Sequence, residues 1–295
     1  MQEILSGATF IVIYGLSYGI VLFLISVGLV VTMGLMRVVN MAHGVFAAGG
    51  GYLMVSLMNS QGFSYAAAIA VSVVAMAAAS VVVERVFFTK LYGAPELEQA
   101  LLTIGLAFIG VASLNLAFGP DIVSAHLPQA LGANIPFLGR TVQTYRLFII
   151  GFGAVVMLVL WYVFDKTNFG ARLRAAVDNR GMAESVGINV RGLFSLAFAL
   201  GSGLAALGSA IGVAVLPLEP IYPLKYLVLI LIIVAMSGAG NVKLAAGVAL
   251  GLGVIDTAGR YFHPEIGSFL IYLAMLVYLL MRGNRLVVAH GGHAR

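Results

Sequence analysis

The sequence predicts an all-α fold: a polytopic membrane helix bundle of eight or nine transmembrane segments, forming a single domain over residues 1–295. Two features of the composition support this fold class. Only 9% of the residues are charged and 61% are hydrophobic, whereas soluble domains are about 25% charged and about 45–50% apolar. The chain also has 36 glycines, and small residues allow membrane helices to pack closely. A soluble fold would leave much of this apolar surface in water.

The spans follow from the lengths of the uncharged stretches. A helix needs about 20 apolar residues to cross the hydrocarbon core of a bilayer. The stretches that approach this length cover residues 8–35, 41–58, 64–83, 99–118, 145–164, 193–215, 225–237, 243–261 and 266–281. The seventh is short and runs into Ser-Gly-Ala-Gly-Asn at 237–241, a sequence typical of a turn or a re-entrant break. The expected count is therefore eight or nine.

The basic residues predict an orientation. Twelve of the 16 Lys and Arg residues fall in connections on one side of the membrane. By the positive-inside rule this side is cytoplasmic, with the amino terminus outside and the carboxyl terminus inside. The inner set is Arg37, Arg85, Lys90, the basic residues of 165–191, Lys243 and those after residue 281; the outer set is Arg140, Arg146, Lys225 and Arg260. The outer connections at 119–144 and 216–225 each carry three prolines and are expected to be surface loops.

The most polar stretch of the chain is the connection at 165–191, which holds 8 of the 27 charged residues. Its composition favours one helix over 171–178 and a second short turn over 182–186, with Gly187 at the position where a helix-ending glycine is common. The apolar residues expected to face the bundle are Leu173, Ala176, Val177, Ala183 and Val186. The loop either fixes topology through its arginines or docks a soluble partner. Interleaved acids favour docking, since topology alone requires only positive charge.

Three segments of the chain carry a resemblance to a known family. The first is Val38-Val39-Asn40-Met41-Ala42-His43-Gly44, and the second is Met236-Ser237-Gly238-Ala239-Gly240-Asn241. The third is the 165–191 loop, through Phe169-Gly170, Leu173-Arg174-Ala175, Asp178-Asn179, Ala183-Glu184 and Gly187-Ile188-Asn189-Val190. In order and spacing these segments resemble the permease subunits of branched-chain amino acid ABC importers, and the compact chain resembles the H-type (LivH-like) subunit.

The resemblance implies a set of partners. This chain has no phosphate-binding loop of the Gly-x4-Gly-Lys-Ser/Thr type, so ATP would be bound by two separate cytoplasmic ATPase subunits. No cofactor is expected in this chain itself. A second, M-type permease would complete a heterodimer in the bacterial inner membrane, in contact with lipid. A periplasmic substrate-binding protein would deliver the substrate. The resemblance assigns ATPase coupling to Gly170, Arg172, Arg174, Asp178, Asn179, Glu184 and Gly187.

Three polar residues are candidates for the translocation path. Asn40 and His43 lie three residues apart, so Asn40 is expected to be the N-cap of the second helix, with His43 at N3 satisfying a backbone group. A helix N-terminus exposed to the path is the compatible alternative. Asp256 lies in an apolar segment four residues before Arg260. This spacing favours a structural ion pair over direct contact with substrate.

Other functions fit the sequence less well. The absence of cysteine excludes disulfides, thiolate metal sites and cysteine nucleophiles. The net charge is +5, but the basic residues form no long run of the kind that binds nucleic acid. No metal site or catalytic residue is expected. The alternatives are a permease for urea or short amides, a proton-coupled carrier, and an intramembrane hydrolase using Ser202 with His43 or His263. The last lacks an evident acid to orient either histidine.

Overall fold

A computed structural model describes residues 2–36, 40–90, 94–137 and 140–291. Val38 and Val39 of the first motif, and Arg37 of the inner basic set, lie outside the described residues. The long helices are α1 (Gln2–Met36), α2 (His43–Gln61), α3 (Tyr65–Val86), α4 (Glu96–Phe118), α6 (Thr144–Lys166), α9 (Val190–Gly212), α12 (Val242–Phe262) and α13 (Leu270–Gly291). The shorter elements are α5 (Gln129–Gly132), α7 (Asn168–Asp178), α8 (Arg180–Ser185), α10 (Tyr222–Lys225), α11 (Leu227–Ser237), the 3-10 turns η1 (Phe88–Lys90) and η2 (Gly267–Phe269), and strands β1 (Asn134–Phe137) and β2 (Arg140–Gln143).

Each predicted span overlaps a helix, although the helices differ in length. Six helices among the described residues are long and apolar enough to cross a membrane: α1, α3, α4, α6, α9 and α12. The segment Tyr222–Ser237 and the segment Leu270–Met281 are apolar but shorter. The prediction of a helical membrane bundle is confirmed by these six helices, and the total of eight or nine spans stays a prediction.

Helices α1 and α9 form the centre of the bundle. The stretch of α1 from Val21 to Ile25 is fully buried, and α1 packs against α6, α9, α11 and α12. The backbones of α1 and α9 meet at Gly28 and Gly201, where a Cβ atom on Gly28 would overlap the Gly201 carbonyl oxygen. Such close approach between membrane helices requires small residues. Helices α3, α4 and α6 instead carry many exposed apolar side chains, as expected of surfaces that face lipid.

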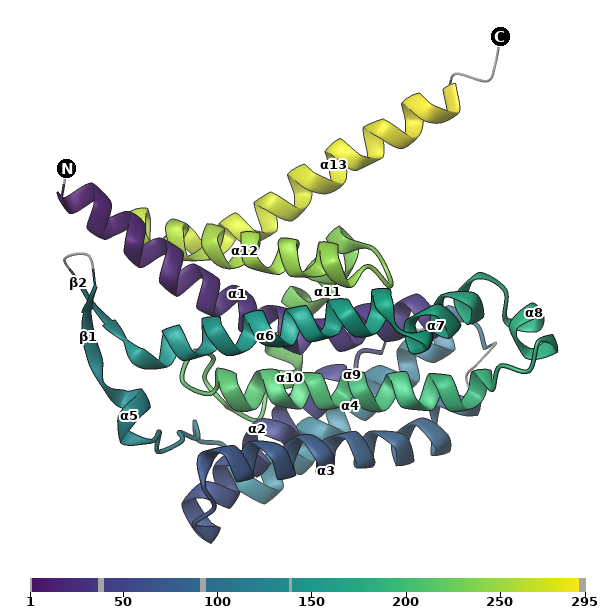
Figure 1. Cartoon of the computed structure of the whole chain (residues 1–295), viewed down its shortest axis with the longest axis horizontal. Helices are drawn as coiled ribbons and strands as arrows, with labels where there is room; N and C mark the ends of the chain where they lie inside the picture. Colours follow the sequence, from purple (N-terminus) through teal and green to yellow (C-terminus); the bar gives the residue numbers. More distant parts are fainter. Residues whose placement is uncertain (1, 37–39, 91–93, 138–139, 292–295) are drawn as a thin grey trace.

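The two ends of the bundle carry different structures. Most long helices run along the long axis of Figure 1, with the β1–β2 hairpin and the start of α1 at one end and with α7 and α8 at the other. Arg85 and Arg191 line one cavity at the α7–α8 end. Arg146, Lys225 and Arg260 line a different cavity, near the hairpin that directly precedes α6. These described basic residues are therefore grouped by end as the sequence predicted.

The all-α class describes the bundle, but the expectation that the connection at 119–144 is only a surface loop is wrong. It contains α5 and an antiparallel hairpin in which Asn134 pairs with Gln143 and Phe137 with Arg140. Proline usually argues against a strand, but both strands of a two-stranded ribbon are edges, where Pro136 is tolerated. Val123 also forms a bridge with Leu218, which joins this connection to the one at 216–225.

Candidate coupling and translocation sites

Helix α7 packs closely against the end of α6, and this close packing requires the glycine at position 170. A Cβ atom at position 170 would overlap the carbonyl oxygen of Phe164. The guanidinium of Arg174 donates a hydrogen bond from Nη1 to the same carbonyl at 2.5 Å. Phe164 and Phe169 also pack their rings with centroids 5.9 Å apart. Helix α7 is thereby held against the last turn of α6.

Helix α8 has a well-formed cap at each end. The side chain of Asn179 accepts a hydrogen bond from the Met182 amide at 3.0 Å, which makes it the N-cap. Gly187 has a φ of 85°, and the amides of Gly187 and Ile188 donate to the carbonyls of Glu184 and Ala183. This bonding pattern is a Schellman motif. The predicted helix-ending role of Gly187 agrees with this geometry.

The pair of short helices packs its apolar side against the bundle, as predicted, with one exception. Leu173, Ala176 and Ala183 are buried and Val177 is half-buried. Val186 is 69% exposed, so its predicted contact with the bundle is wrong. It is the C-cap of α8, where the chain leaves the helix, and Ala183 occupies the inward position one turn earlier. Met182 is also 63% exposed. Helix α8 therefore presents two apolar side chains to the solvent.

The other predicted coupling residues, Arg172, Asp178 and Glu184, are exposed on the surface of α7 and α8. Glu184 pairs with Arg180 at 3.0 Å, with both side chains about half exposed. Exposed pairs of this kind contribute little to stability. Their charges are therefore available to a partner.

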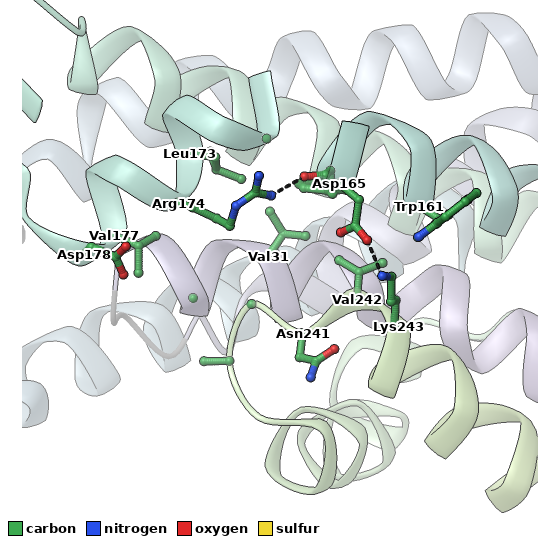
Figure 2. Close-up of a pocket in the computed structure, with 15 residues that line it drawn as sticks. Val31, Trp161, Asp165, Leu173, Arg174, Val177, Asp178, Asn241, Val242 and Lys243 are labelled. Carbon is green, nitrogen blue, oxygen red and sulfur yellow. Dashed lines mark hydrogen bonds and ion pairs between the residues drawn. The ribbon is translucent and has the colours of Figure 1, made fainter. Parts of the chain in front are cut away.

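A cavity of about 470 Å³ separates α7 from the start of α12 (Figure 2). Lys243 on α12 forms an ion pair with Asp165 at the end of α6, and Arg174 and Asp178 line the same cavity. The positive-inside rule predicts Lys243 on the same side as the 165–191 loop, but no sequence spacing predicts its ion pair with Asp165. The lining of this cavity thus comes from both the polar loop and α12, and the ion pair connects the end of α6 to α12.

The break predicted at 237–241 is present. Gly238 and Gly240 have φ values of 76° and 82°, a conformation that favours glycine. The Gly240 amide donates to the carbonyl of Val30 at 2.8 Å, and the side chain of Asn241 caps α12 by accepting from the Leu244 amide at 3.0 Å. Helix α11 thus ends beside α1, and α12 begins after the turn.

The capping role predicted for Asn40 is wrong. Helix α2 begins at His43 with Ala42 as its N-cap, and the Asn40 side chain accepts from the Ala42 amide at 3.0 Å. Asparagine readily forms such a local turn, which precedes the helix here. His43, predicted at N3, is the first helical residue. It is fully buried, and its Nε2 donates to the carbonyl of Ile25 on α1 at 3.0 Å.

Asp256 forms the predicted pair with Arg260. Arg260 Nε donates to Asp256 Oδ2 at 2.8 Å, and Asp256 is only 4% exposed. The other oxygen, Oδ1, is buried without a hydrogen-bond partner. Asp256 lines a cavity whose walls do not include Asn40 or His43. The structure therefore does not bring the three path candidates together in this cavity.

The buried acid Glu84 is not among the residues that the sequence predicted to be functional. Glu84 on α3 is fully buried and accepts a hydrogen bond from the hydroxyl of Ser195 on α9 at 2.7 Å. The predicted span at 64–83 stops one residue short of Glu84, whereas α3 continues to Val86. The available signal was its position at the end of an apolar stretch. Glu84 links two helices at the end of the bundle that carries α7 and α8.

The described residues form a helical bundle with the spans of a polytopic membrane protein and a structured polar loop at one end. The family described as "Branched-chain amino acid transport system / permease component" matches residues 11–279. The chain belongs to this family. Membership confirms the predicted resemblance and the prediction of a transport permease that is not an enzyme, and it removes the hydrolase alternative.

Individual relatives agree with this assignment. The chain is 24% identical to a probable branched-chain amino acid transport permease protein LivH of Methanocaldococcus jannaschii, over 93% of this chain and 89% of the relative. It is 26% identical to BraD, a high-affinity branched-chain amino acid transport system permease protein of Pseudomonas aeruginosa, over 67% of this chain and 68% of the relative. A nucleoside ABC transporter permease protein, NupC of Lactococcus lactis, is 39% identical over 27% of this chain and 25% of its own length.

A solved structure, PsaBC from Streptococcus pneumoniae in complex with Fab, is similar to this chain with a TM-score of 0.49 and 13% identity. The similarity covers 91% of this chain and 89% of that chain.

Proposed function

We propose that this permease is a membrane-spanning subunit of an ATP-driven importer in the bacterial inner membrane. It would carry branched-chain or related hydrophobic amino acids and pair with a second, M-type permease as a heterodimer. The family and the LivH and BraD relatives support the substrate class. The observation that carries the proposal is the capped α7–α8 pair, which gathers exposed charges and exposed apolar side chains at one end.

In this proposal α7 and α8 dock the ATPase subunits. Met182 and Val186 would provide an apolar contact, and the exposed side chains of Arg172, Asp178 and Glu184 in the same loop would provide charged ones. Exposed apolar residues within a polar rim are typical of protein interfaces. Asn179 and Gly187 would hold α8 in the docking geometry through its two caps.

The same elements provide a route for motion into the bundle. Gly170 and Arg174 hold α7 against the end of α6, so a displacement of α7 would move α6. The pair between Asp165 and Lys243 would pass the displacement to α12. The helix α12 carries Asp256, and we assign Asp256, with Asn40 and His43, to the translocation path that this movement opens and closes.

The opposite end would face the periplasm and receive the substrate-binding protein. The Val123–Leu218 bridge joins the two outer connections, so a protein docked on one would also engage the other. In this orientation the amino terminus is outside and the carboxyl terminus is cytoplasmic. The orientation can be tested directly because the chain has no cysteine. In intact spheroplasts an impermeant maleimide should label Asp121→Cys and spare Arg172→Cys. The reverse pattern would contradict the orientation.

Docking is tested by co-purification of the ATPase subunits with affinity-tagged permease. Met182→Lys, Val186→Lys and Arg174→Glu should each reduce ATPase recovery several-fold, and Gly187→Pro should abolish it by destroying the cap. The matched control is Ile122→Lys, because Ile122 is a similarly exposed apolar residue in the outer connection. Equal ATPase recovery with all four variants and the wild type would refute docking at α7–α8.

A further inference from the structure

The cavity at the hairpin end, with a volume of about 740 Å³, has walls of mixed chemistry. Helix α1 contributes Phe10, Tyr14 and Tyr18, which are spaced four residues apart and therefore share one face of the helix. Helix α12 contributes Asp256, and α6 contributes Arg146. The cavity thus combines an aromatic wall with one acidic side chain, Asp256, and three basic side chains, Arg146, Lys225 and Arg260.

The acidic side chain has unused bonding capacity. Arg260 occupies only Oδ2 of Asp256, and Oδ1 is buried with no partner. Burying a carboxylate oxygen without a hydrogen bond is unfavourable. An ammonium group is the most favourable partner for such an oxygen, because it offers both opposite charge and N–H donors.

Of the three basic side chains, Arg146 also has a nitrogen without a hydrogen-bond partner. Arg146 lies over the ring of Tyr14 at 3.9 Å and donates from Nη1 to the hydroxyl of Ser17 at 3.0 Å. Its Nε is buried without a hydrogen-bond partner. Lys225, which also lines the cavity, is already paired with Glu219. Arg146 is therefore placed to receive a carboxylate.

We propose that this cavity is a binding site for a free amino acid with an apolar side chain. The α-ammonium group donates to Asp256 Oδ1, the α-carboxylate accepts from Arg146, and the side chain packs against Phe10, Tyr14 and Tyr18. A simple anion would leave the acid unsatisfied, and a simple cation would leave the base unsatisfied. This inference rests on the proposed function, to which it adds a specific substrate site and a role for Arg146.

The site can be tested first without altering the protein. The assembled permease–ATPase complex in lipid nanodiscs, without nucleotide or binding protein, is titrated with L-leucine, 4-methylpentanoate and 3-methylbutylamine. The last two lack the ammonium and the carboxylate, respectively. Each should bind about tenfold or more weakly than leucine, as expected for loss of a charge-assisted hydrogen bond. Equal affinity for leucine and 4-methylpentanoate, or binding of inorganic phosphate without any binding of leucine, would overturn the proposal.

Variants then assign each charge. Asp256→Asn should weaken leucine binding about tenfold or more while leaving 4-methylpentanoate unchanged, and Arg146→Gln should weaken leucine while leaving 3-methylbutylamine unchanged. The control is Asp121→Asn, an exposed acid at the same end that does not line the cavity. Recovery of the ATPase subunits shows that each variant complex has assembled.

ATP-driven leucine uptake by the wild-type complex with its binding protein is measured in parallel. If uptake occurs but both variants bind leucine as the wild type does, the cavity assignment is wrong and the proposed function stands. If the wild type takes up no leucine, the proposed function itself fails.

Discussion

The carboxylate of Asp165, at the end of α6, forms an ion pair with the ammonium of Lys243, in the first turn of α12. These residues are far apart in sequence and belong to different helices, yet both line the cavity beside α7 (Figure 2). The pair connects the proposed docking loop to the helix that carries Asp256.

Reversing one charge of this pair should impair transport. Asp165→Lys places two ammonium groups together, so we expect ATP-driven uptake to fall several-fold while the unfolding temperature barely changes, because both side chains are partly exposed. The exchange Asp165→Lys with Lys243→Asp should recover most of the uptake. No recovery in the double variant would show that the pair itself does not carry the coupling.

Gly170 should tolerate no side chain. A Cβ atom there would overlap the Phe164 carbonyl, so Gly170→Ala must displace α7 from α6 at a cost of about 1–3 kcal/mol. The control is Gly105→Ala on α4, where a Cβ would meet nothing within 4 Å. Thermal unfolding of the purified complex and ATPase recovery are the measurements. Equal stability of the two variants would contradict the close packing of α7.

Gly187 provides a graded test of the α8 cap. Its φ of 85° is accessible to asparagine at a small cost but strained for β-branched residues. Gly187→Asn should therefore retain most ATPase binding, whereas Gly187→Val should lose most of it. Affinity of the ATPase for the permease in nanodiscs measures both. If valine and asparagine have the same effect, the left-handed conformation is not what docking requires.

His43 should stabilise the bundle through its bond to α1. His43→Phe removes the donor to the Ile25 carbonyl and should lower the free energy of unfolding by about 1 kcal/mol. His43→Gln retains an N–H donor and should lose less. Denaturation of the detergent-solubilised complex compares the two variants. A phenylalanine variant as stable as the wild type would show that the hydrogen bond from His43 to Ile25 does not stabilise the bundle.

The sequence predicted best where local rules decide the structure. The helix at 171–178, the short turn at 182–186 and the glycine turn at 237–241 follow from composition and glycine placement. The structure has α7 at Asn168–Asp178, α8 at Arg180–Ser185 and left-handed glycines at 187, 238 and 240. Asp256 and Arg260 pair because four residues separate them on one helix.

Features that depend on distant parts of the chain were not predictable. The pair between Glu84 and Ser195 and the bond from His43 to Ile25 join different helices, and no local spacing encodes them. Asn40 was misassigned because its side chain suits both a helix cap and a preceding turn. The hairpin around Pro136 was missed because proline argues against a strand unless that strand is an edge.

The most direct test of the central claim is uptake of radiolabelled leucine into proteoliposomes that hold both permeases and the ATPase subunits, with the binding protein outside and ATP inside. Our account predicts leucine uptake that requires internal ATP and persists when an uncoupler abolishes the proton gradient. Uptake driven by the proton gradient without ATP, or uptake of a nucleoside or urea but not of leucine, would contradict it.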